Sequence, residues 1–496
     1  MGFKGFDPVK LKGLADELDG LAQHSGGLHS RLATVLTTAQ QNLPPGQSAS
    51  RDPDLQNLVG DVVPIPFFGR MRLPGSLAGE LGDMQSSMKR RITQLESLQK
   101  FADLGYPVDQ SVVFLDEKAP DGKKVDDALK DLKALNGEDF GTNGNRDDLE
   151  KVNAELSGLT SAELDALFTK ADPADLSRYN ALLNNTDDSW LNPFDSNGIP
   201  ENDRRAVLGN LLSKIGADNM SKFTNAFPGV QPIFTNSEAY KNGGNSQNGQ
   251  NNSGIHWQVP TDPLFNGDVS ADDINQRQFG DCWFVSSLAA VAQKDPQFIK
   301  DGIKQNPNGT ISVRVWDKSG NYQWVTMTPD LPTDTNGNPL STYGNGDTWS
   351  AYYEKAFALT YKDENGQSGY GGIEGDDPKK SAPFLTGHDG SDLTRSSGFL
   401  GLGTSEDKRF SSMKAAFDSG KAVTVSTPDD EGLDKNHPAE WGGTYHSNHA
   451  YYVRGFTPDG KIILGNPWGV SNYPPITVTQ DQFNKYFQSP EEYDVP

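Results

Sequence analysis

The single cysteine of this chain, Cys282, lies in a sequence context that favours a reactive thiol. Gly280 and Asp281 precede it, and the small and apolar residues that follow it are typical of a helix buried on all sides. Because glycine permits a turn and aspartate is a good N-cap, Cys282 is predicted to open this helix. Unpaired amides and the helix dipole at that position favour a thiolate and lower the pKa of the sulfur. We therefore interpret Cys282 as a nucleophile.

A cysteine nucleophile needs a base, normally histidine, and a third group that orients the imidazole. A strand pattern follows His449, and a turn leads to a second strand that ends before Asn466. We expect Phe456 to pair with Lys461 across this turn. In that register His449 and Asn466 are diagonal neighbours on one face of the hairpin. His446 has the opposite parity and is expected on the other face if the strand extends that far.

Four ordered motifs between about residues 258 and 488 resemble the protease core of the calpain family of papain-like cysteine peptidases. They are Gln276-x-x-x-Gly-Asp-Cys-Trp, the helix Trp349 to Ala358 with its Glu-Lys-Ala sequence, His449-Ala-Tyr, and Asn466-Pro-Trp-Gly. The resemblance implies an α+β, two-lobed peptidase domain. Its cleft would lie between an α-rich half that holds Cys282 and a β-rich half that holds His449 and Asn466.

The resemblance also implies a role for each matching residue. Cys282 would be the nucleophile, His449 the general base and acid, and Asn466 the residue that fixes the imidazole. Gln276 would donate its side-chain amide to the oxyanion beside the backbone N–H of the cysteine. Two tryptophans would contribute to substrate binding or cover the active site. These are Trp468, over the hydrogen bond between His449 and Asn466, and Trp283.

The implied reaction is hydrolysis of peptide bonds in protein substrates through a thioester, and it requires no cofactor. The same three catalytic residue types also serve amidases, transglutaminases and deamidases, and only the products separate these activities. A non-catalytic secreted interaction protein is the alternative from another class. The intact set of catalytic residues favours an endopeptidase.

Calcium is an option that the resemblance leaves open. In animal calpains the ion aligns the two halves of the core, and Asp273 and Glu374 match the positions expected to bind it. A second acidic segment, residues 139–150, has the Gly144 and Glu150 of a calcium-binding helix-loop-helix. Because Gly141 occupies a ligand position there, we interpret that segment as a solvated loop.

The rest of the chain divides into three segments. Apolar residues at coiled-coil spacing predict a helical hairpin over residues 1–105, which resembles the helical-hairpin module of actinobacterial type VII secretion substrates. Residues 110–240 show short helical patterns and predict a small all-α domain. Residues 241–256 are rich in Asn, Gly and Ser and predict a flexible linker. The peptidase domain then occupies residues 257–496.

Composition limits the partners and the location. The chain has 496 residues and a net charge of −23, which argues against a grip on nucleic-acid phosphates. The longest apolar runs are too short to insert into a membrane, one cysteine permits no internal disulfide, and the N-terminus lacks a Sec-type signal. Two locations remain: the cytoplasm, or export without a classical signal as a bacterial effector or toxin. In the second case the type VII machinery, or a helical immunity protein, would be a partner.

Overall fold

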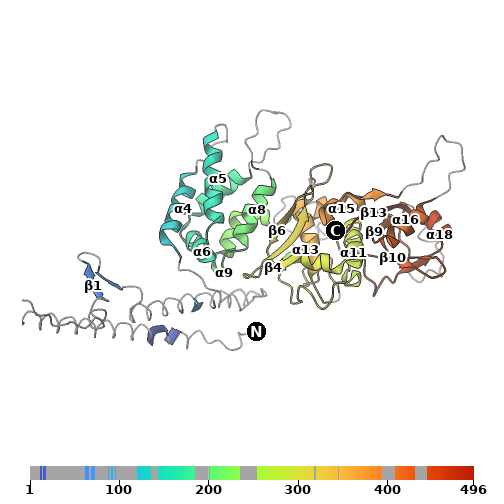
Figure 1. The fold of residues 1–496 in the computed structure, drawn as a ribbon, viewed down its shortest axis with the longest axis horizontal. Helices are drawn as coiled ribbons and strands as arrows, with labels where there is room; N and C mark the ends of the chain where they lie inside the picture. Colours follow the sequence, from blue (N-terminus) through green and yellow to red (C-terminus); the bar gives the residue numbers. More distant parts are fainter. Residues whose placement is uncertain are drawn as a thin grey trace, which may run out of the picture. The chain divides into compact units, whose positions relative to one another are not determined.

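The computed structural model describes residues 120–135, 143–184, 199, 201–234, 254–317, 320–344, 346–393, 408–429 and 444–496, with short segments between residues 12 and 95. The chain forms two compact units, one of residues 1–103 with 107–121 and one of residues 104–106 with 122–496. Figure 1 shows the elements in sequence colours.

Little of the predicted hairpin over residues 1–105 lies within the described residues. Leu95, which belongs to the apolar seam of the predicted second helix, is helical and buried. Between the two predicted helices the chain forms an antiparallel pair of strands, β1 (Val62–Ile65) and β2 (Gly69–Arg72). The prediction of an all-α N-terminal region therefore needs correction at this pair. The resemblance to secretion modules lies outside the described residues.

Helices fill the described part of residues 122–230. They are α4 (Gly122–Ala134), α5 (Asn143–Ser157), α6 (Ser161–Lys170), α7 (Pro173–Leu183), α8 (Glu201–Leu212), α9 (Ala217–Ala226) and the 3₁₀ turn η2 (Pro228–Val230). Local sequence explains where they begin: Thr160 and Glu163 form a capping box on α6, and Asp172 caps α7 with a proline in its first turn. Because α5 begins at Asn143, Gly144 and Glu150 are helical and cannot belong to a calcium loop of the expected form.

The first half of the peptidase region is built on the predicted buried helix, α11 (Cys282–Lys294), and on α13 (Trp349–Thr360). Both pack into one hydrophobic core with an antiparallel sheet of order β4-β5-β6. The strands are β4 (Ile303–Gln305), β5 (Ile311–Trp316) and β6 (Tyr322–Met327), and a separate pair joins β3 (His256–Gln258) to β7 (Leu331–Thr333). The smaller elements are η3 (Ala271–Asp273), α12 (Pro296–Asp301), α14 (Gly369–Gly372), η4 (Pro378–Lys380) and α15 (Ala382–Thr386).

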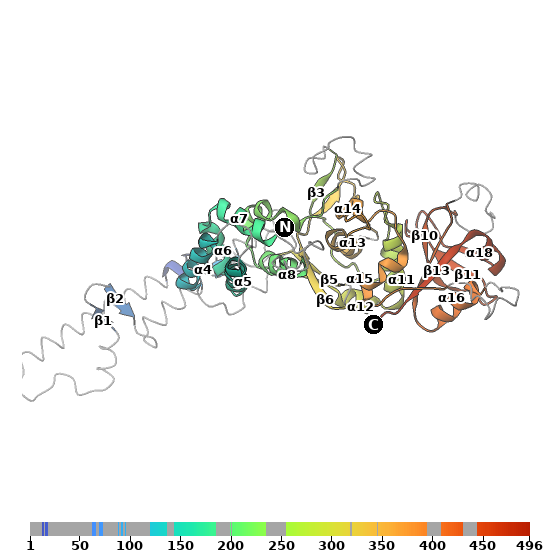
Figure 2. The same cartoon turned by 90° about the horizontal axis from the view of Figure 1, so that it is seen from above.

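The second half has a hydrophobic core of its own. Its six-stranded sheet has the order β12-β11-β10-β9-β13-β8. The elements are β8 (Ser391–Asp392), α16 (Arg409–Asp418), β9 (Ala422–Ser426), β10 (Ala450–Phe456), β11 (Ile462–Gly465), β12 (Ile476–Val478), α18 (Gln480–Tyr486) and β13 (Gln488–Tyr493). The mixed helix and sheet content predicted for this region is confirmed, and Figure 2 shows α11 between the two sheets.

The hairpin of β10 and β11 has the predicted register at one end only. Near the site Tyr452 pairs with Gly465, as expected. Near the turn Phe456 pairs with Ile462 instead of Lys461, because a β-bulge between Val453 and Gly455 shifts the register by one residue. The predicted pairing at the turn was wrong, yet the bulge returns the strand to the register that places Asn466 beside the His449 end.

Candidate active site

The sulfur of Cys282 lies where the sequence placed it, at the first residue of α11. Helix α11 is tied to β10, since Ser286 donates to the carbonyl of Ala450 at 2.8 Å and Gln293 donates to the carbonyl of Val453 at 3.0 Å. Because Ala450 follows His449 in the chain, the contact of Ser286 with Ala450 brings the cysteine and the histidine segment together.

The protonation of the thiol differs from the expectation. Burial raises the pKa of Cys282 to about 11, and the charge of Asp281 adds to this effect. The backbone amides of Ala450, Trp283 and Cys282 lower the pKa, as expected for a helix start, but burial outweighs them. In this substrate-free conformation Cys282 is therefore a neutral thiol rather than the thiolate that the sequence suggested.

The imidazole of His449 meets Asn466 inside the protein. His449 is 5% exposed and Asn466 is 3% exposed, and Nε2 of the histidine lies 3.0 Å from Oδ1 of the asparagine. Burial lowers the pKa of His449 to about 4, although the hydrogen bond to Asn466 raises it. If Nε2 carries the proton and donates to Asn466, Nδ1 is left as a proton acceptor.

A residue that the sequence analysis missed holds the histidine backbone. Thr427 follows β9, and its hydroxyl accepts from the His449 N–H at 2.9 Å, while its own N–H donates to the His449 carbonyl at 2.9 Å. Asn448, just before the histidine, has φ 47°, a left-handed conformation that asparagine tolerates. A lone Thr at a strand end carries no sequence signal for this role, which depends on pairing between β9 and β10.

Trp468 lies against the pair as expected. Its ring centroid is 4.3 Å from that of His449, and the backbone N–H of Trp468 donates to Oδ1 of Asn466 at 3.0 Å. The parity argument for His446 does not apply, because β10 begins only at Ala450; the His446 ring lies 4.4 Å from the Trp468 ring.

Trp283 does not cover the site, which corrects its assignment. It is 0% exposed, and its indole N–H donates to the carbonyl of Ile373 at 2.7 Å. Its ring packs edge-on against Phe357 with centroids 5.3 Å apart. Trp283 belongs to the core because helix geometry turns its side chain away from that of the preceding cysteine.

Gln276 is held near the site but faces a different partner from the one expected. Its backbone N–H donates to the carbonyl of Pro467 at 2.8 Å, beside Asn466. Its side-chain amide donates to the carbonyl of Phe279 at 2.7 Å and to Oδ1 of Asp281 at 3.1 Å. Both amide hydrogens are therefore engaged in this conformation, and a role at the oxyanion requires one of these bonds to open.

Two carboxyl groups are buried behind the cysteine. Asp281 is 0% exposed and Glu354 is 1% exposed. Burial raises the pKa of Asp281 well above its usual range, and the charges of Glu354 and Glu374 reinforce this. Burial also raises the pKa of Glu354 to about 8, although the N–H of Thr342 donates to its Oε2 at 2.5 Å. At mildly acidic pH Glu354 is therefore a neutral acid inside the core.

The two carboxylates expected for calcium, Asp273 and Glu374, each have a neighbour of their own in the fold. Glu374 accepts from the N–H of Gly280 at 3.2 Å, so that it supports the turn before the cysteine. Asp273 instead has Asp347 as its neighbour. Burial, and after it the charge of Asp273, raises the pKa of Asp347 to about 7, and Oδ1 of Asp347 is buried without a hydrogen-bond partner.

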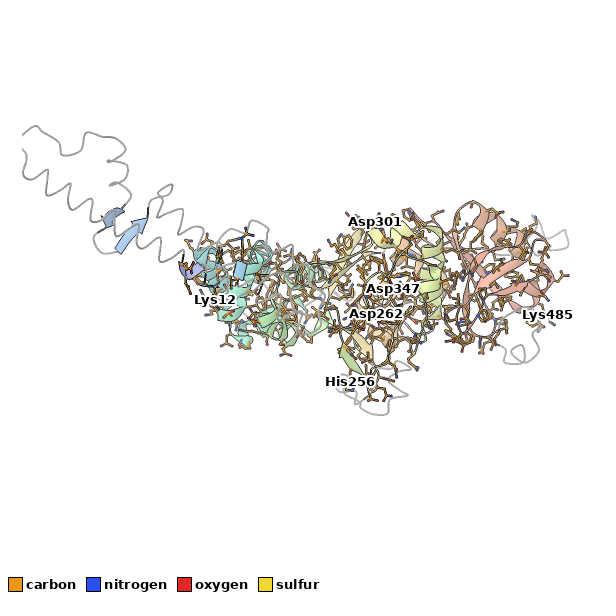
Figure 3. The ribbon with its side chains drawn as sticks, turned by 90° about the horizontal axis from the view of Figure 1, so that it is seen from below. Lys12, His256, Asp262, Asp301, Asp347 and Lys485 are labelled. Atoms are coloured by element: carbon orange, nitrogen blue, oxygen red, sulfur yellow. The ribbon has the colours of Figure 1, made fainter. Side chains whose placement is uncertain are left out.

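Asp262 adds a third charge to this neighbourhood, since it also raises the pKa of Asp347 (Figure 3). The described residues contain no group of three or more His, Cys, Asp or Glu side chains arranged to hold a metal ion. Two neighbouring carboxylates with an unsatisfied oxygen nevertheless fit a calcium ion whose other ligands are backbone oxygens and water.

Comparison with known proteins agrees with this geometry. Residues 231–476 match the model of the family described as calpain family cysteine protease. Calpain-8 of Mus musculus is 27% identical over 242 residues, which cover 44% of this chain and 31% of that protein. Calpain clp-1 of Caenorhabditis elegans is 25% identical over 213 residues, which cover 40% of this chain and 25% of that protein.

The calpain-type cysteine protease DEK1 of Zea mays is 24% identical over 212 residues, which cover 41% of this chain and 9% of that protein. The chain thus spans between 9% and 31% of the lengths of these three relatives. Residues 231–476 form a calpain-family cysteine protease domain. Among the residues that the structure describes, no helix is long and apolar enough to cross a membrane.

Proposed function

We propose that this chain is a cysteine endopeptidase that uses Cys282, His449 and Asn466. One observation carries the proposal: the buried imidazole of His449 lies 3.0 Å from the amide oxygen of Asn466, and the carbonyl of the next residue, Ala450, accepts from Ser286 of the helix that Cys282 begins. A nucleophile, a base and an orienting group are thus assembled from two separate cores.

The pKa values of Cys282 and His449 favour a mechanism in which the thiol and the imidazole are both neutral before attack, and the imidazole acts as the general base. As the thiol approaches a peptide carbonyl, Nδ1 of His449 takes the proton from Cys282 and the bond between sulfur and carbon forms. The imidazolium then gives its proton to the departing amine as the carbon–nitrogen bond breaks, which leaves a thioester. Water then attacks the thioester carbon while His449 takes its proton; the carbon–sulfur bond breaks, the carboxylic acid is released, and the imidazolium returns the proton to the sulfur.

The oxyanion formed in each step lies near the start of α11, where the first backbone N–H groups of a helix have no intrahelical partner. The N–H of Cys282 is one donor. Gln276 supplies the second when its amide leaves Asp281, and the carbonyl of Phe279 retains the other amide hydrogen. Trp468 covers the bond between His449 and Asn466 and excludes water from it.

Calcium is proposed as a structural ligand. Asp273 and Asp347 would hold it, and the ion would neutralise the repulsion between these two carboxylates. Asp273 is the last residue of η3 and lies three residues before Gln276, whereas Asp347 lies just before α13. Binding would therefore stabilise the arrangement of these two segments without taking part in bond breaking.

Two further aspects remain proposals. An amidase, transglutaminase or deamidase would use the same three side chains, and export as an effector rests on the N-terminal helical pattern.

Covalent trapping of the nucleophile tests the proposed catalytic residues. A peptide with an electrophilic carbonyl mimic should attach to Cys282 in the wild-type protein, as read by mass spectrometry. Attachment should fall in the variant His449→Ala. Equal attachment in both proteins would contradict a base role for His449.

A further inference from the structure

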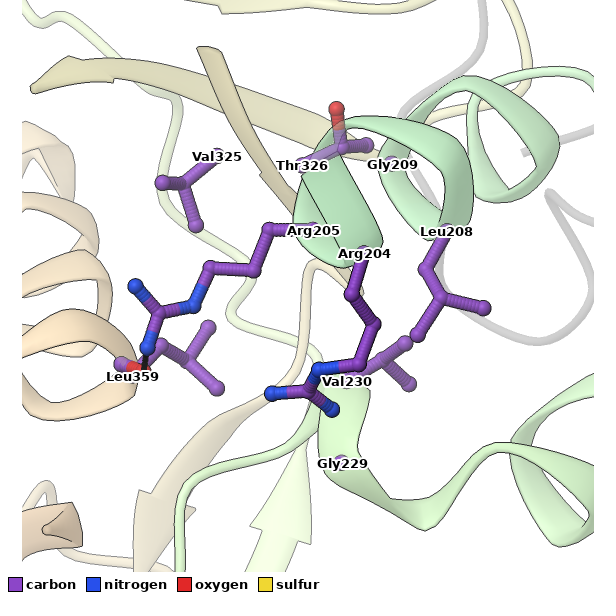
Figure 4. Close-up of a pocket in the computed structure, with 9 residues that line it drawn as sticks. All are labelled: Arg204, Arg205, Leu208, Gly209, Gly229, Val230, Val325, Thr326 and Leu359. Carbon is purple, nitrogen blue, oxygen red and sulfur yellow. Dashed lines mark hydrogen bonds between the residues drawn. The ribbon is translucent and has the colours of Figure 1, made fainter. Parts of the chain in front are cut away.

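Helix α8, from the helical region, packs directly on strand β6 of the peptidase region. Gly209 makes this approach close, because a Cβ atom at that position would lie 3.2 Å from the hydroxyl oxygen of Thr326. Figure 4 shows Arg204, Arg205, Leu208 and Val325 around the small pocket left beside this contact. A side chain larger than that of glycine would push the helix away from the strand.

The ends of two helices are capped across the same contact. Asn308 is 9% exposed, and its amide donates to the carbonyls of Leu212 and Ile215 at 2.8 and 3.0 Å, which satisfies the C-terminal end of α8. In return, Arg205 of α8 donates to the carbonyl of Leu359 in the last turn of α13 at 2.9 Å. The helical region and the peptidase region thus each donate hydrogen bonds to backbone carbonyls of the other.

The segment after α9 enters the core of the peptidase region. Lys355 is 0% exposed and pairs with Asp330 at 3.0 Å. Gln231 donates to both carboxylate oxygens of Asp330, at 2.8 and 2.9 Å. These two charge-assisted hydrogen bonds attach the segment after α9 to the carboxylate that pairs with Lys355.

Phe234 ends this segment inside an aromatic cluster. Its ring is stacked on that of Tyr370, with centroids 5.1 Å apart, and lies 5.2 Å from the ring of Trp257. Trp257 lies on β3, after the Asn- and Gly-rich connection of residues 235–253. The two ends of that connection are therefore anchored against each other, rather than on two separate bodies.

The other helices are attached to this segment as well. Lys222 of α9 donates to the carbonyls of Phe168 and Ala171 at 2.6 Å, and Asp165 accepts from the N–H of Gly216 at 2.7 Å. We propose that residues 199–234 dock permanently on the peptidase region through the contact of α8 with β6, so that cutting the connection 235–253 does not release the N-terminal half.

The test uses the full chain as Cys282→Ala, which prevents self-digestion, with a recognition sequence for a specific protease inserted after Asn248 and a C-terminal affinity tag. After complete cutting, verified on a denaturing gel, we expect the N-terminal fragment to stay on the affinity resin through washing and to elute with its partner as one peak. Loss of that fragment in the wash would overturn the proposal.

A matched pair of variants locates the docking surface. Gly209→Trp should release the fragment after cutting, whereas Ala206→Trp, on the exposed face of the same helix, should retain it. Equal retention in both would show that α8 on β6 does not hold the halves together. Asn308→Ala, with two lost hydrogen bonds and no added bulk, should weaken retention at least several-fold and remains informative if Gly209→Trp fails to fold. Unchanged retention there would also count against this surface.

Discussion

At the scale of single residues, burial controls the chemistry more than helix position does. The sequence indicated that His449 and Asn466 come together, because strand parity carries that information. It did not indicate the protonation of Cys282 and His449. The amides at the start of α11 do lower the pKa of Cys282, yet burial in the folded core raises it further, and burial depends on packing from distant segments.

The pH dependence of catalysis tests this point. Because burial lowers the pKa of His449 to about 4, its neutral form persists as the pH falls from 6.5 to about 4. We expect kcat/KM to decline only below about pH 4, and Asn466→Ala to move this decline to lower pH, since Asn466 raises the pKa. Asn472→Ala, at an exposed site nearby, serves as the control. A decline centred near pH 6.5 would contradict the neutral pair.

The raised pKa of Glu354 predicts that the stability of the fold depends on pH. Its pKa is raised from 4.5 to about 8 in the fold, so the folded state holds more protons than the unfolded state between these values. The contribution of Glu354 to stability is present below about pH 4.5 and is lost as the pH rises through 8. Glu354→Gln should remove this loss.

Chemical denaturation at pH 5 and pH 8.5 measures that difference. The variant should gain free energy of unfolding over the wild type at the higher pH, whereas Glu364→Gln, a change at an exposed side chain, should not. An identical pH dependence in wild type and Glu354→Gln would show that Glu354 is ionised in the fold.

The proposed calcium site can be tested with a variant of Asp347. Any ligand that binds only the folded state raises its stability, so millimolar calcium should raise the Tm of the wild-type protein. Asp347→Asn should lose most of that rise because one of the two carboxylates is gone. Glu374→Gln should keep it, since this carboxylate contacts the N–H of Gly280. Equal shifts in all three proteins would place the ion elsewhere.

At the scale of elements, periodicity predicted the buried helix and the hairpin correctly, and local irregularities were missed. The bulge between Val453 and Gly455 shifts the register at the turn, and a strand that begins at Ala450 changes the side on which His446 lies. Such irregularities in strand pairing and strand ends are not visible in the local pattern of apolar and polar residues.

The hairpin also contains a glycine, Gly465, whose replacement by a larger residue should destabilise the protein. A Cβ atom at Gly465 would lie 2.3 Å from the ring of its cross-strand partner Tyr452, which is 1% exposed and has no room to move. Gly465→Ala should therefore destabilise the protein by about 1–3 kcal/mol and displace the adjacent Asn466, which lowers kcat. Gly122→Ala, where a Cβ meets no atom within 4 Å, is the control. Full activity and stability of Gly465→Ala would refute the packing argument.

At the scale of the whole molecule, composition and motifs predicted a peptidase region of mixed helix and sheet. They did not predict how the helical region meets it. Low-complexity sequence between two patterned regions is typical of a tether between domains, yet Phe234 and Trp257 anchor both ends of this one in the same cluster. Contacts between segments far apart in sequence decide this, and they leave no periodic signal.

The central claim, that Cys282 performs peptide-bond hydrolysis, is tested most directly on an unfolded protein. Purified wild-type protein and Cys282→Ala are incubated with casein, with and without millimolar calcium, and the products are identified by mass spectrometry. We expect new peptide termini with the wild-type protein and none with the variant. Products that carry only deamidated or cross-linked glutamines would identify another acyl-transfer enzyme, and cleavage that survives in Cys282→Ala would contradict the account.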